Sequence, residues 1–362
     1  MAANNNDKIK KLRARIDTLD EKIQELITQR AHVVLDVAKE KTRTGVENFY
    51  RPEREAEVLN KIMARHQGPL PAEEMARLFR EIMSACLALE SKLRVAFLGP
   101  EGTFTQEAAL KHFGQSVETV GLSAIDEVFR EVEAGSVQFG VVPVENSTEG
   151  VVNHTLDMFL VSPLKICGEV ELRVHHNLLG KGDDWDAAEK IVSHQQSLAQ
   201  CREWLDEHFS GVERVAVSSN AEAARLAAEQ PGVVAIAGAS AARIYGLNVL
   251  AANIEDKPDN STRFLVIGNL ETGACGSDKT SVMVSGKNRA GGLHHLLAPL
   301  ARAKINMTRI ESRPSRRTPW EYVFFIDVDG HAKDRRVANA LKLLEREAAF
   351  FKWLGSYPKA VL

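Results

Sequence analysis

Three cations in the N-terminal part of the chain are placed where they could bind an anion. Arg30 occupies a position in an apolar seam, and Arg13 and Lys41 lie beside that seam. A guanidinium withdrawn from water needs an opposite charge. That charge is either a glutamate of the chain, with the arginine head group extended toward solvent, or the carboxylate of a ligand. The sequence leaves both possibilities open.

Helix length limits how these cations can work together. On one helix Arg13 and Lys41 are ~42 Å apart, whereas Arg30 and Lys41 are ~16 Å apart. Arg30 and Lys41 can therefore hold opposite ends of one small ligand. Arg13 can join them only from a second chain that runs antiparallel to the first. Arg54 and Glu55 add polar groups near the start of a second helix.

A carboxylate on an apolar helix face is a further candidate. Glu90 follows Cys86 by four residues and Met83 by seven, so its side chain faces the same way as that apolar stripe. A carboxylate donates a hydrogen bond only when it is protonated. Either Glu90 acts in a site as the protonated acid, or it pairs with a nearby arginine or lysine at the helix end.

Polar clusters follow three strand-like segments farther along the chain. In α/β folds ligands bind beyond strand ends, and helix N-termini bind carboxylates through free backbone N–H groups. Helix capping is the alternative explanation for each single residue, and Ser193, Ser218 and Asn220 stand where N-caps are expected. The candidate residues are Glu145, Asn146, Ser147 and Thr148, then Ser193, Gln195 and Gln200, then Asn260, Thr262, Arg263 and Phe264.

Two motifs near the C-terminus suit a small-ligand sensor. Glycines at a helix start let a carboxylate approach backbone N–H groups, although a tight turn would use them as well. The second motif leaves a predicted strand. The candidate effector-binding residues are Gly291, Gly292 and Leu293, and Glu311, Ser312, Arg313 and Pro314.

The elements that must position these residues begin with a helical region. A heptad seam runs from Ile9 to Val37, and two shorter helical patterns follow, the first of them starting near Pro52. No strand pattern interrupts them. Residues 1–92 are therefore predicted to form an all-α domain.

The apolar period changes abruptly at Leu93. Strand and helix patterns alternate over residues 93–270, which predicts an α/β domain. A polar linker at 271–279 precedes the order strand–helix–strand–strand–helix–strand over residues 280–362, which is the α+β ferredoxin-like order.

Composition excludes several classes of protein. The 362 residues carry a net charge of −3, which does not point to nucleic acid or a membrane surface as the main partner. The four cysteines form no CxxC pair, so we expect reduced thiols in a cytoplasmic protein rather than a metal site or disulfide framework. Neither a signal-peptide pattern nor a membrane-length apolar run is present, and the FLGPEGTFT segment lacks the dinucleotide-binding GxGxxG spacing.

The helical region resembles the all-helical chorismate mutases. Arg13, Arg30, Lys41, Arg54–Glu55 and the SACLALE stretch at 84–90 match their pattern. The resemblance implies an intertwined homodimer, with one arginine from the partner, and rearrangement of chorismate to prephenate. This pericyclic reaction needs cations and hydrogen-bond donors around a dianion, with no metal or cofactor. Enteric members of the family have glutamine where Glu90 stands.

The remainder resembles the prephenate dehydratases with their ACT regulatory domain. FLGPEGTFT, PVENS, SHQQ and NSTRF occur in the family order, and ESRP at 311–314 matches an ACT motif. The resemblance implies a two-lobed domain like a periplasmic binding protein, which decarboxylates and dehydrates prephenate to phenylpyruvate. It gives a catalytic role to Thr262, which we expect to be a hydrogen-bond donor because threonine is a weak acid. It also implies that phenylalanine binds between two ACT domains and inhibits.

These features together predict a bifunctional enzyme of phenylalanine biosynthesis. A non-catalytic amino-acid-sensing protein built on the same folds is the main alternative, but binding alone does not need the seam cations and Thr262. A secreted solute receptor is a weaker alternative because the sequence has no signal-peptide pattern.

Overall fold

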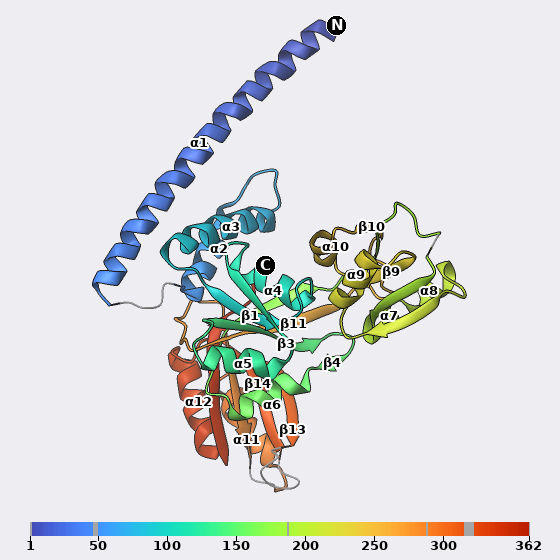
Figure 1. The fold of residues 1–362 in the computed structure, drawn as a ribbon. Coiled ribbons are helices and arrows are strands. Elements are labelled where there is room, and N and C mark those ends of the chain that lie inside the picture. Colours follow the sequence, from blue (N-terminus) through green and yellow to red (C-terminus); the bar gives the residue numbers. More distant parts are fainter. Residues whose placement is uncertain (1, 46–49, 187, 287–288, 315–321, 362) are drawn as a thin grey trace.

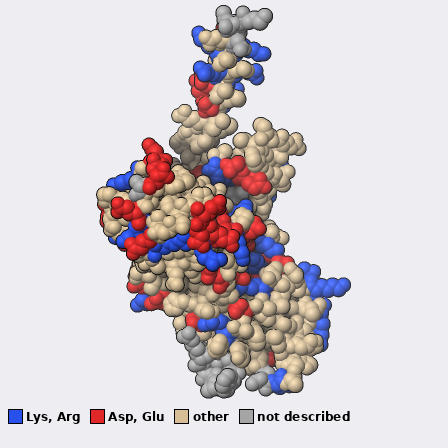
Figure 2. Space-filling model, turned by 90° about the vertical axis from the view of Figure 1, so that its right-hand side faces the viewer, with Lys and Arg blue, Asp and Glu red and all other residues tan. Residues whose placement is uncertain are grey.

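The computed structural model describes residues 2–45, 50–186, 188–286, 289–314 and 322–361. Three parts follow one another along the chain, as Figure 1 shows: a group of helices, a two-lobed α/β body and a small α+β domain. The multidomain fold predicted from the sequence is confirmed. On the face shown in Figure 2, acidic and basic side chains lie side by side, in keeping with the small net charge.

The helical part consists of α1 (Ala2–Arg43), α2 (Pro52–Arg65) and α3 (Ala72–Glu90). α1 projects away from the body of the molecule (Figure 1), and only its C-terminal part lies near α3. The apolar seam of α1 is consequently open to solvent over its whole length. Its exposed residues are Ile9, Leu12, Ile16, Leu19, Ile23, Leu26, Val33 and Val37, each at least 44% exposed.

The first lobe of the α/β body is built on a mixed six-stranded sheet. Its strand order is β2-β1-β3-β11-β5, with β4 paired to β3. The strands are β1 (Arg94–Leu98), β2 (Glu118–Leu122), β3 (Phe139–Asn146), β4 (Gly150–Val151), β5 (Lys165–Arg173) and β11 (Ser261–Gly268), and the helices are α4 (Phe104–Phe113), α5 (Ile125–Glu133) and α6 (Asn153–Val161).

The second lobe has its own five-stranded sheet, in the order β10-β6-β9-β7-β8. The chain enters this lobe after β5 and leaves it before β11, so two crossing segments join the lobes. The strands are β6 (Asn177–Gly180), β7 (Lys190–His194), β8 (Glu213–Val217), β9 (Val233–Ala237) and β10 (Asn248–Ala251), and the helices are α7 (Gln195–Gln200), α8 (Arg202–His208), α9 (Asn220–Glu229) and α10 (Ala239–Tyr245).

The C-terminal part has the predicted ferredoxin-like order. Its four strands form an antiparallel sheet in the order β13-β14-β12-β15. The elements are β12 (Asp278–Ser285), α11 (Gly292–Arg302), β13 (Met307–Pro314), β14 (Tyr322–Asp329), α12 (Arg335–Glu347) and β15 (Phe350–Pro358).

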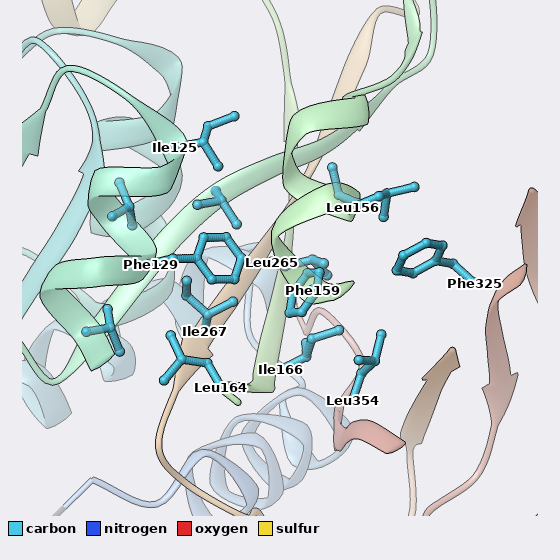
Figure 3. Packing of buried hydrophobic residues seen from close by; sticks show 14 of the residues in the cluster. Ile125, Phe129, Leu156, Phe159, Leu164, Ile166, Leu265, Ile267, Phe325 and Leu354 are labelled. Atoms are coloured by element: carbon cyan, nitrogen blue, oxygen red, sulfur yellow. The ribbon is translucent and has the colours of Figure 1, made fainter. Parts of the chain in front are cut away.

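One apolar core joins this domain to the first lobe. Phe159 and Ile166 of the lobe belong to the same buried cluster as Phe325 and Leu354 of the C-terminal sheet (Figure 3). Because this contact removes large apolar side chains from water, it favours a fixed docking of the two domains. The short linker at 271–279 therefore connects bodies that are already held together by packing.

Candidate active sites and effector site

A cleft of about 650 Å³ lies between the two lobes. Its walls come from the end of strand β3, the beginning of strand β11 and the starts of helices α4 and α9. This volume is within the range of small-ligand sites. Five of the residues predicted from the sequence line the cleft: Asn146, Gln200, Asn260, Thr262 and Phe264.

The hydroxyl of Thr262 has a defined direction of hydrogen bonding. Asn146 Nδ2 donates to Thr262 Oγ1 at 2.7 Å and to Asn260 Oδ1 at 2.9 Å. The amide of Asn146 is fixed in this orientation because its Oδ1 accepts from the backbone N–H groups of Thr148 and Glu149. Thr262 Oγ1 is thus an acceptor toward Asn146, and its own proton is available to donate to a molecule in the cleft.

A hydrogen-bonded chain links this pair to the second lobe. Asn260 Nδ2 donates to Gln200 Oε1 at 3.0 Å, and Gln200 Nε2 donates to Glu149 Oε1 at 3.3 Å. His176 Nε2 donates to the same Gln200 oxygen at 2.8 Å. Asn146 and Thr262 are therefore connected with both sides of the cleft, so lobe movement would disturb their alignment.

His176 is a cleft residue that the sequence analysis missed. It is 1% exposed, and its Nδ1 has no hydrogen-bond partner among the described residues. Burial lowers the pKa of His176, which favours the neutral ring. No motif marked it, because it lies in a crossing segment between two strands and not in one of the polar clusters.

The cleft has the electrostatics of a carboxylate site without cationic side chains. The N-cap residues Thr103 of α4, Val152 of α6 and Ser219 of α9 line it, so the positive ends of three helices face the ligand space. None of the described residues that line the cleft is a lysine or arginine. An anion in this cleft would therefore be held by backbone N–H groups, hydroxyls and amides.

The predicted helix caps in the second lobe are each displaced by one residue. Ser219 caps α9 in place of Ser218 or Asn220, and His194 caps α7 in place of Ser193. Asn220 has a different role, since its Oδ1 accepts from Ser193 Oγ at 3.0 Å and from the backbone N–H of His194 at 3.2 Å. These contacts fix the cleft wall opposite Thr262.

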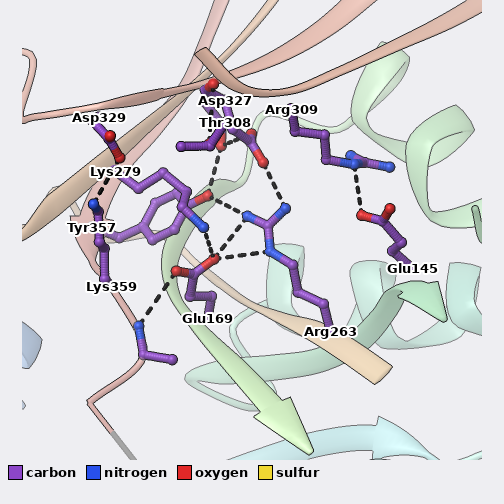
Figure 4. Close-up of polar contacts among 12 residues, drawn as sticks. Glu145, Glu169, Arg263, Lys279, Thr308, Arg309, Asp327, Asp329, Tyr357 and Lys359 are labelled. Atoms are coloured by element: carbon purple, nitrogen blue, oxygen red, sulfur yellow. Dashed lines mark hydrogen bonds and ion pairs between the residues drawn. The ribbon is translucent and has the colours of Figure 1, made fainter. Parts of the chain in front are cut away.

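The other predicted substrate-binding residues lie outside the lining of the cleft. Ser147 accepts from the Ser261 backbone N–H, Thr148 and Gln195 are exposed, and Ser193 is buried behind the wall. Two more point away from the cleft toward the C-terminal domain (Figure 4): Glu145, whose Oε2 is 2.9 Å from Arg309 Nε, and Arg263, whose Nη1 is 2.6 Å from Asp327 Oδ2.

The helical part brings together some of its predicted residues. Lys41 Nζ lies 3.3 Å from Glu90 Oε2, which joins the end of α1 to the end of α3. Arg30 is half-buried, and its Nη1 has no partner among the described residues. Arg13 is an exposed residue of α1, as the length argument requires of a residue that acts on another chain.

Glu55 and Arg54 face other surroundings. Arg54 is exposed and pairs with Glu57 at 2.9 Å. Glu55 pairs with Arg80 at 3.2 Å, and Arg80 also donates to the Lys111 carbonyl of the α/β body. Burial raises the pKa of Glu55, against the opposing effect of the Arg80 charge. In this conformation Glu55 belongs to the junction between domains.

Comparison with known families accounts for these three parts in order. The chorismate mutase type II family model matches residues 12–91, the prephenate dehydratase model matches 95–272, and the ACT domain model matches 280–345. A bifunctional chorismate mutase/prephenate dehydratase from Pseudomonas aeruginosa is 60% identical and covers 98% of this chain and 99% of its own length. The chain belongs to this family. The corresponding protein of Neisseria gonorrhoeae is 53% identical over 96% of each chain.

Solved structures agree for the α/β and ACT domains. A prephenate dehydratase from Arthrobacter aurescens in complex with L-Phe has a TM-score of 0.69 and 36% identity, and covers 74% of this chain and 90% of its own. Among the residues that the structure describes, no helix is long and apolar enough to cross a membrane. Within the same described residues, no group of three or more histidine, cysteine, aspartate or glutamate side chains could hold a metal ion.

The two motifs of the ACT domain are open to solvent in the single chain. Gly291 has the left-handed φ of +74° that glycine adopts without strain, and it precedes α11. Gly291, Leu293, Ser312 and Pro314 are exposed, whereas Gly292, Glu311 and Arg313 are half-buried. A ligand at these motifs would need a second surface to enclose it.

Proposed function

We propose that residues 93–270 convert prephenate to phenylpyruvate in the cleft and that Thr262 is the group that assists loss of the hydroxyl. Loss of CO₂ leaves an electron pair that aromatises the ring as the C–O bond breaks, and the departing hydroxide needs a proton or a strong donor. The observation that carries this assignment is the 2.7 Å bond from Asn146 Nδ2 to Thr262 Oγ1, which leaves the threonine proton free to donate.

We assign Asn146, Gln200, Asn260 and Phe264 to substrate binding in the same cleft. The two carboxylates of prephenate suit the helix N-termini there, because these supply backbone N–H donors and a positive field. Of the remaining polar residues of the same motifs, Ser147 and Ser193 support the walls from outside through hydrogen bonds, and Thr148 and Gln195 are exposed beside them.

We propose that residues 1–92 rearrange chorismate to prephenate in a homodimer. The exposed seam of α1 would be covered by the antiparallel α1 of a second copy, which brings the partner's Arg13 to Arg30, Lys41 and Glu90. Arg54 and Glu55 would approach this site from α2. Eight large apolar side chains in one open stripe support this interpretation, since such a stripe is unfavourable in water.

We further propose that residues 280–362 bind phenylalanine between two ACT domains and that the enzyme is cytoplasmic. The glycine-rich start of α11, with Gly291, Gly292 and Leu293, would receive the ligand carboxylate. Residues 311–314 of the ESRP motif would form the second side of the site.

One assay tests the whole proposal. Purified chain is supplied with chorismate, and phenylpyruvate is measured with and without phenylalanine. The proposal requires phenylpyruvate to form and phenylalanine to reduce its rate. A chain that binds phenylalanine but produces neither prephenate nor phenylpyruvate would instead be the non-catalytic sensor considered as the alternative.

A further inference from the structure

The two strands that carry the cleft residues also carry contacts to the ACT domain. In a strand, successive side chains face opposite sides of the sheet. Strand β11 pairs with β3 so that Thr262 is opposite Asn146 and Arg263 is opposite Glu145. Thr262 and Asn146 line the cleft, and their immediate neighbours reach the ACT domain. Thr262 is thus directly followed in the chain by Arg263, and Asn146 is directly preceded by Glu145, and both of these neighbours are bound by the ACT domain.

Arg263 is the centre of a buried charge network, shown in Figure 4. Its guanidinium lies 2.8 Å from Glu169 Oε2 of the neighbouring strand β5 and 2.6 Å from Asp327 Oδ2 of β14, and it donates to the Tyr357 hydroxyl of β15 at 3.1 Å. Lys279 of β12 lies 2.7 Å from Glu169 as well. Two cations and two carboxylates therefore balance each other at the domain boundary, with the Arg263 side chain only 12% exposed.

Glu145 is held by a second contact. Arg309 Nε of β13 lies 2.9 Å from Glu145 Oε2, and the Arg309 side chain is 12% exposed. Four residues farther along β13, Arg313 donates to Asn153 at 2.5 Å and to Asp157 at 3.0 Å, both on helix α6. Glu311, a candidate effector-binding residue, lies between these two arginines on the same face of β13. Strand β13 therefore touches the α/β body on both sides of Glu311, through Arg309 before the effector motif and through Arg313 within it.

Docking of the ACT domain does not require these ion pairs. The shared apolar core around Phe159 and Phe325 already joins the two domains. Burying charges costs solvation free energy, and such networks contribute little to stability compared with apolar packing, whereas they fix geometry. Because these pairs hold the residues next to Asn146 and Thr262, the geometry that they fix includes the position of those two cleft residues.

We propose that Glu145 and Arg263 are positioning residues of the dehydratase site, through which the ACT domain sets the alignment of Asn146 and Thr262. The proposal rests on the proposed function of the cleft. Occupation of the effector site at Glu311 shifts strand β13, Arg309 carries the shift to Glu145, and the Asn146–Thr262 hydrogen bond changes with it. The sequence assigned Glu145 and Arg263 to substrate binding, and their contacts assign them to this coupling.

The test compares four variants of the full-length enzyme. Arg309→Gln and Glu145→Gln each remove the same ion pair, and their double variant completes a cycle. Arg263→Lys keeps the charge but cannot span Glu169, Asp327 and Tyr357 together. A matched control is Lys165→Met. It removes another contact between the two domains, the 2.8 Å hydrogen bond from Lys165 Nζ to the Trp353 carbonyl. Lys165 is opposite Gly268, at the end of β11 that is remote from Thr262.

Five quantities are measured for each variant: dehydratase kcat, dehydratase KM, the phenylalanine concentration for half-inhibition, phenylalanine affinity by calorimetry, and mutase activity. We expect Arg309→Gln and Glu145→Gln each to raise the half-inhibition concentration at least ~10-fold. Their double variant should be no worse than either single variant. Phenylalanine affinity should change much less. Arg263→Lys should lower dehydratase kcat at least ~5-fold with little change in KM, because it misplaces Thr262. Mutase activity reports that the helical part of each variant is folded, and retained phenylalanine affinity reports the same for the ACT domain.

Two results would overturn the proposal. One is that Arg309→Gln and Glu145→Gln shift inhibition no more than Lys165→Met does. The other is that inhibition weakens only in proportion to lost phenylalanine affinity, which would place Arg309 in the ligand site. Both presuppose that the wild-type chain forms phenylpyruvate; a wild-type chain that forms none would contradict the proposed function itself.

Discussion

The cleft and the helical part differ in how much of each site a single chain supplies. In the cleft, Asn146 and Thr262 are in hydrogen-bonding contact and the ligand space has walls on both sides. In the helical part, Lys41 and Glu90 are in contact, but Arg13 is exposed near the other end of α1. The buried Nη1 of Arg30 has no hydrogen-bond partner among the described residues.

The two proposed sites bring distant residues together in two different ways. The α/β lobes use the chain's own crossing segments to bring β3 and β11 together with the second lobe. A single long helix cannot fold back on itself, so residues at its two ends meet only when another helix runs antiparallel to it. Dehydratase activity in the cleft should therefore persist when the protein is diluted until its chains dissociate, whereas mutase activity should be lost.

The largest expected effect is the loss of mutase activity in two single variants and its recovery when they are mixed. This experiment tests whether the helical site needs two chains. Arg13→Ala and Arg30→Ala should each lower mutase kcat/KM at least ~100-fold, because each removes a charged donor to a dianionic transition state. If Arg13 acts on the partner's site, mixing the two variants should restore activity to about one quarter of wild type, since half of the dimers are mixed and each has one complete site.

The control for this experiment is dehydratase activity, which should stay near wild type in both variants and in the mixture. A mixture that remains as inactive as its components after subunit exchange would show that Arg13 and Arg30 serve the same chain. The contrast between the two parts would then have to be abandoned.

The next effect concerns the cleft and tests the proposed role of Thr262. Thr262→Ala removes the hydroxyl that we propose as the donor to the leaving group, so dehydratase kcat should fall at least ~10-fold, equivalent to ~1.4 kcal/mol of transition-state stabilisation. Thr262→Ser keeps the donor and should recover most of this loss. Mutase activity measured in the same preparations should stay within about twofold. Near-normal phenylpyruvate formation by Thr262→Ala would exclude the hydroxyl from the mechanism.

Much of the fold could be predicted because its signals are local. The heptad seam, the change of period at Leu93 and the ferredoxin-like order are patterns of neighbouring residues. Strands β2, β4, β6 and β10 were not predicted, because they are short and their residues do not alternate in polarity clearly. β2, for example, reads ETVGL, with polar or glycine residues at three of its five positions.

The contacts between domains could not be predicted, because they depend on which face of an element meets another domain. NSTRF and PVENS marked the correct strands, but the alternation that sends Thr262 to the cleft and Arg263 to Asp327 is visible only once the C-terminal sheet is in place. His176 was missed for a similar reason, since a residue between strands has no periodicity to reveal it.

A third experiment concerns Glu90 at the end of α3. Its Oε2 accepts a hydrogen bond from Lys41 Nζ at 3.3 Å, and a carboxylate has no proton to donate. Glu90→Gln places a side chain that both accepts and donates at the same position. If the mutase reaction needs a donor here, this variant should raise mutase kcat/KM several-fold or more at neutral pH. Equal kcat/KM values for the two proteins would remove the hydrogen-bond role from Glu90.

The smallest expected effect concerns the junction at which the helical part meets the first lobe. His112 of α4 is hydrogen-bonded to Tyr50 at 3.0 Å, next to the Arg80 that reaches from α3 to the Lys111 carbonyl. Burial, and to a lesser degree the charge of Arg80, lowers the pKa of His112 from 6.5 to about 3. Between these values the unfolded chain binds a proton that the folded chain does not.

Stability should therefore rise with pH across this window and level off above about 6.5, with His112 contributing at most ~1.4 kcal/mol per pH unit. His112→Gln removes this titration, so its free energy of unfolding should depend less on pH between about 7 and 5 than that of wild type. The measurement is denaturant unfolding at each pH, followed by mutase and dehydratase activity. Because His112 lies between the parts, both activities of the wild type should be lost together on acidification. Two results would contradict this prediction: equal slopes of unfolding free energy against pH for wild type and His112→Gln, or a mutase activity that persists after dehydratase activity is lost. Either result would show that the helical part is stabilised by its partner chain and not by the first lobe.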